Sequence, residues 1–249
     1  MRSLFRVNAL PDRVDAEVSS DTVTALHVDL AVPAQLLVLI GGGEFSFGET
    51  REIDEFLLRS MPAERRVVAF IPAASGSAEY ATHFGKYLLG IDPTVETVNV
   101  PIYRGRDSRR QKNLNTLSSA GMIYLGGGVT NNLLAVLRES AADLAMREAA
   151  AQGTVIAAIG AAASCFGIAA RDMHGIAASL PALGWIANTV VDTSFEPEND
   201  ANLRRLMSVP ETQLGLGIPA GTALAIRSGG DTEIIGAGHV AAFRKGQAR

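Results

Sequence analysis

The sequence has little cysteine and no excess of positive charge. Its 249 residues include one cysteine, which excludes an internal disulfide framework. Acidic and basic residues are interspersed and the formal net charge is −4, so no broad cationic face is available to bind a phosphate backbone. We therefore expect no nucleic-acid partner.

Long apolar runs and a secretory leader are missing as well. The stretches 36–43 and 155–167 are too short or too rich in glycine to span a bilayer. The first residues lack the basic, apolar and small-residue order of a secretory signal. The four histidines are scattered, and no histidine or cysteine falls at ligand spacing, so we expect no metal ion and no cofactor. These absences predict a cytoplasmic protein without a membrane partner.

Short apolar runs alternate with amphipathic helical stretches over most of the chain. Strands are expected at 36–40, 67–71, 95–100, 122–125 and 155–159, with helices between them. This alternation is typical of a parallel sheet covered by helices on both faces. After residue 184 the pattern changes to mixed or antiparallel strands, expected at 185–191, 214–218, 222–226 and 233–243, with one helix at 200–207.

The length favours one core, so residues 35–249 are expected to form a single domain. Residues 1–34 have no obvious place in the parallel order. They contain one alternating stretch at 22–32, which predicts an added edge strand or arm. Such an arm could mediate a homodimer.

The most informative segment is 153–164. An apolar strand at 155–159 runs directly into Gly160 and a helix of very small residues. This is the sequence form of a nucleophile elbow, a tight strand-to-helix turn that presents a reactive side chain. Because position 160 is glycine, neither a hydroxyl nor a thiol stands at the apex of this turn.

Small residues also follow three predicted parallel strands, at 41–43, 73–76 and 126–128. Ligands of open α/β sheets bind beyond the carboxyl ends of the strands, where glycine lets main-chain N–H groups approach closely. The plainer interpretation is that these residues only end strands and begin helices. The predicted ligand-binding residues are Gly42, Gly43, Ser75, Gly127, Gly128, Asn131 and Ala161.

Taken together, these segments resemble the cyanophycinase and dipeptidase E serine peptidases. The similar stretches are 39–44, 70–76, 123–131, 183–195, 215–224 and 234–238, in order within residues 36–244. The resemblance places the chain in the class I glutamine amidotransferase-like superfamily. It implies a flavodoxin-like three-layer α/β/α sandwich with added C-terminal antiparallel strands, and a hydrolase of small aspartyl or isoaspartyl peptides or amides.

The chain departs from the family at its catalytic positions. The family's elbow serine falls on Gly160, and the histidine of its His-Phe motif falls on Ser194, before Phe195. Acyl transfer needs an oxygen or sulfur nucleophile with a base in hydrogen-bond reach. Glycine at position 160 supplies no nucleophile, and serine at position 194 supplies no base. The resemblance therefore implies a degenerate serine peptidase that binds a small molecule, a peptide or a protein partner in the inherited crevice.

Four other residues could supply replacement chemistry. Cys165 and Ser164 lie about one helical turn past the elbow, so we interpret them as a buried core thiol and a hydroxyl bonded to a backbone carbonyl. Asp172 and His174 could serve a repurposed enzyme if their side chains converge within about 7 Å of Gly160. A working hydrolase with a nucleophile at Cys165 or Ser164 is the third alternative.

One basic run stands apart from these segments, at 103–110. It contains four arginines and follows the strand expected at 95–100. It could receive a carboxylate at that strand's end, or form a solvated loop and helix start.

Overall fold

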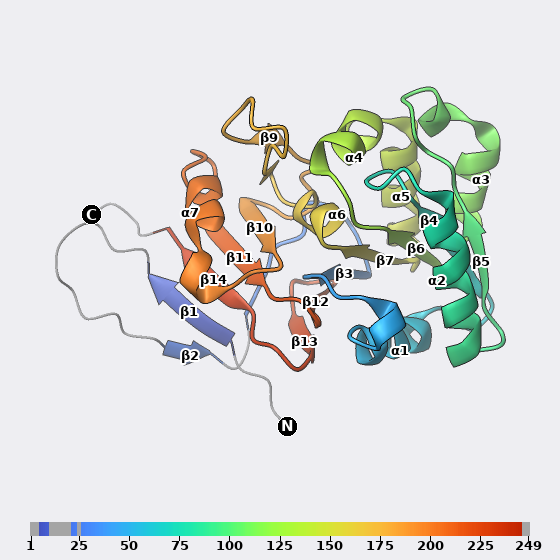
Figure 1. Cartoon of the computed structure of the whole chain (residues 1–249), viewed down its shortest axis with the longest axis horizontal. Coiled ribbons are helices and arrows are strands. Elements are labelled where there is room, and N and C mark those ends of the chain that lie inside the picture. The colour runs from blue at the N-terminus through green and yellow to red at the C-terminus, as the bar shows by residue number, and fades with distance from the viewer. Residues whose placement is uncertain (1–4, 10–20, 24–25, 246–249) are drawn as a thin grey trace.

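The computed structural model describes residues 5–9, 21–23 and 26–245. Its centre is a mostly parallel sheet with helices on both faces, which confirms the predicted three-layer α/β/α architecture (Figure 1). Among the described residues this sheet has seven strands, in the order β13 (Thr232–Gly236), β12 (Thr222–Arg227), β3 (Leu36–Ile40), β7 (Val155–Ile159), β6 (Met122–Leu125), β4 (Val67–Ile71) and β5 (Glu96–Asn99). The strands from β3 to β5 are parallel. Strand β12 pairs antiparallel with β3, and β13 pairs antiparallel with β12 at the end of the sheet.

Apolar residues on alternate positions of the strands build two cores. Val38, Phe70 and Tyr124 face helices α1 (Arg51–Ser60) and α2 (Ala78–Ile91), and their neighbours Leu39 and Ile71 face the opposite layer. That layer comprises α3 (Gln111–Ser119), α4 (Thr130–Leu137), α5 (Ala141–Ala151) and α6 (Ala161–Ser164). Because successive side chains of a strand point to opposite faces, a strand buried on both sides is apolar throughout.

The C-terminal strands divide between two sheets, which the sequence pattern did not separate. Within the described residues a second sheet runs β10 (Thr189–Thr193), β11 (Leu214–Ile218), β14 (Ala241–Arg244), β1 (Phe5–Ala9) and β2 (Asp21–Val23). The stretch expected as one strand at 233–243 is split between β13 and β14. Gly236 has a φ of 96°, a conformation that favours glycine, so the chain can leave the central sheet there.

Shorter elements connect these strands. They are η1 (Phe45–Phe47), η2 (Asp107–Arg109), η3 (Pro197–Asn199), α7 (Ala201–Met207), and the small hairpin β8 (Ala169–Ala170) with β9 (Leu180–Pro181). Helix α7 covers β10 and β11 with a third apolar cluster that includes Leu203 and Phe243. None of the helices in the described part of the chain is long and apolar enough to cross a membrane.

Part of the predicted N-terminal arm lies outside the described residues. In its described part at 26–34 buried and exposed residues alternate as expected, and Leu26, Val28 and Val32 are buried. Instead of a continuous strand it makes single bridges, from His27 to Asp231 and from Leu30 to Ile186. A role in a homodimer stays a prediction.

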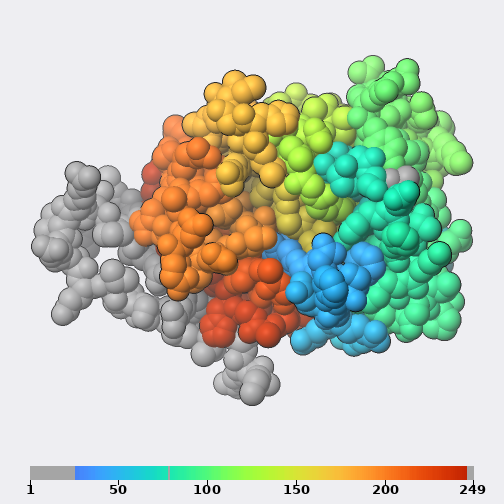
Figure 2. Space-filling model, viewed as in Figure 1, coloured from blue at the N-terminus to red at the C-terminus, as the bar shows by residue number. Residues whose placement is uncertain are grey.

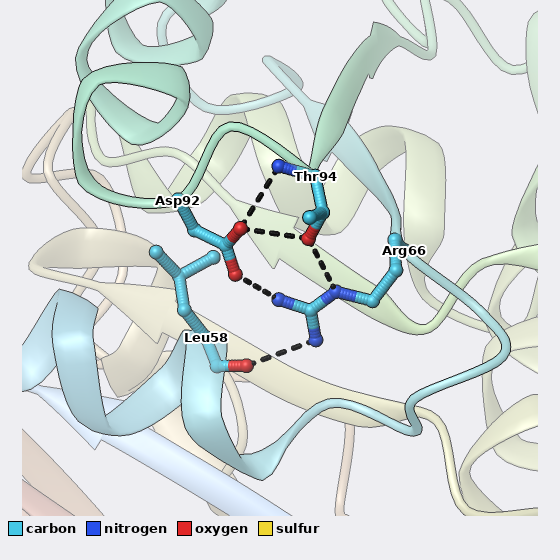
Figure 3. A network of polar contacts seen from close by, with 4 residues as sticks. All are labelled: Leu58, Arg66, Asp92 and Thr94. Atoms are coloured by element: carbon cyan, nitrogen blue, oxygen red, sulfur yellow. Dashed lines mark hydrogen bonds and ion pairs between the residues drawn. The ribbon is translucent and has the colours of Figure 1, made fainter.

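Two arginines form hydrogen bonds near the amino ends of the central strands. Arg65 donates hydrogen bonds to the carbonyls of Ala120 and Gln152 and to the hydroxyl of Thr154. Figure 3 shows the second, Arg66, which binds the Leu58 carbonyl, the Thr94 hydroxyl and the Asp92 carboxylate. Both arginines lie at the edge of the sheet opposite the carboxyl ends of the strands, so they support the fold and leave the other edge to a site.

Candidate functional site

The predicted elbow forms where the central strand β7 meets α6. Strand β7 is fully buried, and the amide of Gly160 donates a 2.8 Å hydrogen bond to the carbonyl of Ile40 on the neighbouring strand. Gly160 has φ 57° and ψ −128°, a strained combination for any residue with a side chain. A Cβ atom built on Gly160 would meet no other atom within 4 Å. The apex of the turn is therefore open and carries no side chain.

Strand order explains why small residues surround this apex. Strand β7 lies between β3 and β6, so the glycine runs that follow those two strands flank Gly160. Gly128 has a φ of 147°, and a Cβ on it would lie 2.4 Å from the carbonyl of Ala74. Glycine is required at this position by the close approach of the two loops.

A cavity of about 260 Å³ opens over the elbow, and we call it the elbow crevice. Its lining includes Gly128, Gly160, Ala161, Ser164, Met173 and Leu206. It adjoins a cavity of about 590 Å³, which we call the outer crevice, and both are lined by Arg171, Asp192, Thr193, Ser194 and Asn202. In Figure 2 the surface is hollowed between the gold loop that precedes β9 and the orange segment after β10.

Ser194 lies at the rim shared by the two cavities. It has a φ of 50°, unusual for serine, and its amide and hydroxyl both donate to the carbonyl of Gly41, at 2.7 and 3.3 Å. A Cβ on Gly42 would lie 3.0 Å from the Ser194 hydroxyl, so this glycine run packs directly under Ser194. A serine hydroxyl is too weak a base to accept a proton near neutral pH.

Asp172 is buried and turned into its own loop. Its carboxylate accepts hydrogen bonds from the Asn131 amide and from the backbone N–H groups of His174, Ile176 and Ala177. The N–H of Ala177 and the amide of Asn131 together hold the pKa of Asp172 well below its usual range. Neither Asp172 nor the exposed His174 lines the elbow crevice.

Cys165 and Ser164 both donate hydrogen bonds to the carbonyl of Ala161. The thiol of Cys165 does so at 3.2 Å and the hydroxyl of Ser164 at 2.9 Å. Cys165 has no exposed surface, and burial raises the pKa of its thiol far above its ordinary value. Ser164 lines the elbow crevice but has no histidine beside it in the crevice lining. Neither arrangement provides an activated nucleophile.

The predicted ligand-binding residues divide into two groups. Gly128 and Ala161 line the elbow crevice. The other five line neither crevice. Gly42 packs under Ser194, Gly43 lies against Thr50, Gly127 lies against the carbonyl of Ile159, Ser75 bonds the carbonyl of Pro72, and Asn131 holds the 172–177 loop.

Sequence reasoning missed the charged residues of the crevices. Asp192 is half-buried, and burial raises its pKa above the ordinary value, opposed by a 2.7 Å hydrogen bond from the Asn202 amide and by the charge of Arg171. The guanidinium of Arg171 makes no hydrogen bond or ion pair within the described residues. Asp192 stands two positions before Ser194 in the stretch 183–195 that resembles the family, so its place beside the crevice could have been inferred. Arg171 lies outside the stretches that resemble the family, so nothing in the sequence indicated its place in the crevices.

A mostly parallel sheet whose central strand ends in an elbow under a crevice defines a three-layer α/β protein with its candidate site at the carboxyl ends of the strands. The model of peptidase family S51 matches residues 37–234. An uncharacterized peptidase, YgaJ of Bacillus subtilis (strain 168), is 30% identical over 173 residues, which cover 68% of this chain and 70% of that protein. The chain belongs to peptidase family S51.

Solved structures agree with this fold. A peptidase from an acI-B1 Actinobacterium superposes with a TM-score of 0.70 at 22% identity, covering 83% of this chain and 89% of that one. A putative peptidase E protein from Listeria monocytogenes EGD-e gives a TM-score of 0.60 at 17% identity, covering 82% and 100%. At these identities the likeness concerns the fold.

Proposed function

We propose that this member of peptidase family S51 binds a small ligand in its crevices and does not hydrolyse it by acyl transfer. One observation carries the proposal: the residue at the apex of the elbow, in the strained conformation that presents a nucleophile, has no side chain. The position where the resemblance expects a base holds Ser194, bonded to the Gly41 carbonyl. Without a nucleophile and a base, acyl transfer loses both of its proton-handling groups.

The charges of the crevices favour a ligand that carries both signs. Arg171 and Arg205 supply guanidinium groups, and Asp192 and Glu196 supply carboxylates, all along the outer crevice. Arg171 and Asp192 also line the elbow crevice, where their charges interact without forming an ion pair in the described residues. A small zwitterion, such as an amino acid or a dipeptide, can place a carboxylate near Arg171 and an ammonium group near Asp192.

A repurposed enzyme that uses Asp172 and His174 has less support. All the hydrogen bonds of the Asp172 carboxylate go to its own loop and to Asn131, and neither residue lines the elbow crevice. A working hydrolase with Cys165 as its nucleophile is disfavoured by the burial of that thiol. Among the described residues, Asp192 is the one carboxylate that lines the elbow crevice, and we assign it to binding.

Calorimetric titration of the purified protein with aspartyl and isoaspartyl dipeptides tests the proposal. We expect saturable binding, and mass spectrometry of the same sample should recover the dipeptide intact. Arg171→Gln and Asp192→Asn should each weaken binding, whereas the distant Arg138→Gln should leave it unchanged. Absence of binding to any small zwitterion would contradict the claim that the crevices bind such a ligand. Recovery of the free amino acids would contradict the claim that the protein does not hydrolyse it.

A further inference from the structure

The basic run at 103–110 and the first two residues of α3, Gln111 and Lys112, are here called the basic loop, which is not part of the crevices. It follows β5, which is the edge strand of the central sheet, whereas the elbow lies on β7 (Figure 1). Its helical turn η2 packs against α3, α4 and α5. The loop is therefore a separate surface with its own rigid support.

Asp107 holds the basic loop in one conformation. Its buried carboxylate accepts hydrogen bonds from the backbone N–H groups of Tyr103 and Arg104 and forms a 3.1 Å ion pair with Arg110. The buried amide of Asn113 donates to the backbone carbonyl of Asp107 at 2.9 Å. Although burial opposes it, the two N–H groups keep the pKa of Asp107 below its ordinary value, so the carboxylate stays charged and committed to the loop.

Three arginines of the loop are left exposed by this arrangement. Arg104, Arg106 and Arg109 make no side-chain hydrogen bond or ion pair with any described residue. In contrast, Arg110 is held by Asp107 and therefore belongs to the scaffold of the loop. Asp107 orders the backbone that carries these three side chains, and the planar fork of each guanidinium group matches a carboxylate.

The charge of the whole chain limits the size of the partner. The basic loop holds five cationic side chains and one carboxylate, so the remainder of the chain carries a formal charge of −8. A long polyanion or an anionic membrane surface would also meet that remainder and be repelled. A short anionic segment can contact the basic loop alone.

We propose that the basic loop is a docking site for a short acidic peptide segment of a partner protein. Carboxylates of the segment would pair with Arg104, Arg106 and Arg109. The site is independent of the crevices, so it adds a protein partner to the small-ligand function.

Fluorescence anisotropy of a labelled hexaglutamate peptide, titrated with the full chain at low salt, tests the proposal. We expect saturable binding that weakens as salt is added. The variant Arg104→Gln with Arg106→Gln and Arg109→Gln should bind about tenfold more weakly, because each exposed pair contributes only a fraction of a kcal/mol to about 1 kcal/mol. Arg110 is left intact in this variant so that the loop keeps its fold.

A matched triple variant separates the loop from net charge. Arg59→Gln with Arg138→Gln and Arg227→Gln removes the same charge from exposed arginines elsewhere and should retain the affinity of the original chain. Equal weakening in both triple variants, or no hexaglutamate binding at all, would overturn the proposal. Equal affinity for single-stranded DNA of matched charge would overturn the choice of an acidic peptide.

Discussion

Replacing Gly160 tests the strain of the empty elbow. A residue with a side chain held at φ 57° and ψ −128° costs on the order of 1–3 kcal/mol. A side chain at this position meets open space, so no steric clash adds to that cost. Loss of the glycine also lowers the entropy of the unfolded chain, which offsets about 0.4–1 kcal/mol. We expect Gly160→Ala and Gly160→Ser to lower the free energy of unfolding by about 1–2 kcal/mol each.

Urea unfolding followed by the fluorescence of Trp185, the single and fully buried tryptophan, measures this change. Gly128→Ala is the matched control, because its Cβ would lie 2.4 Å from the Ala74 carbonyl and the backbone must move. Gly128→Ala should therefore lower the free energy of unfolding by more than Gly160→Ala does. If Gly160→Ala left stability unchanged, the elbow would not be strained, and a loss equal to that of Gly128→Ala would show that the apex is not open.

Three further predictions concern a buried carboxylate, a buried thiol and a partly exposed arginine. Burial raises the pKa of Asp54 from 3.8 to about 6, so the folded state binds its proton more tightly, and stability should fall by up to about 3 kcal/mol as pH rises through that interval. Asp54→Asn should flatten this dependence in urea unfolding across the same pH range, and an unchanged slope would contradict the assignment. Iodoacetamide should modify Cys165 at least about a hundredfold faster in urea than in the folded protein, and rapid labelling of the folded protein would show an accessible thiolate. Arg65→Ala should cost about 2–4 kcal/mol in thermal unfolding, because it leaves three acceptors at 120, 152 and 154 without their charged donor, and a loss below about 1 kcal/mol would mean that water replaces it.

Local patterns predicted the parallel strands and the elbow because each depends on neighbours in the sequence. The apolar run of β7 and the small residues after it determine the turn at Gly160 directly. The division of the C-terminal strands between two sheets could not be read in the same way, because β13 and β14 follow one another in the chain and are separated only by their different partners, β12 and β11. Strand pairing over long separations is a tertiary property.

The crevices were harder to predict than the fold because they depend on side-chain direction in loops. Asp172 and Arg171 are adjacent in the chain, yet Asp172 turns into its loop and Arg171 faces both cavities. Asp192 and Asn202 come from β10 and α7 and meet through a 2.7 Å hydrogen bond. Such convergence follows from the packing of α7 on the second sheet, for which the sequence gives no local signal.

The most direct test of the empty elbow is the rate at which the purified chain hydrolyses aspartyl and isoaspartyl dipeptides. Gly160→Ala, purified in the same way, reports any contaminating peptidase. We predict that the rates of the unaltered chain and of Gly160→Ala are both equal to the background. Turnover by the unaltered chain at ordinary enzyme rates, about 1–1,000 per second, that disappears in Gly160→Ala would contradict this account.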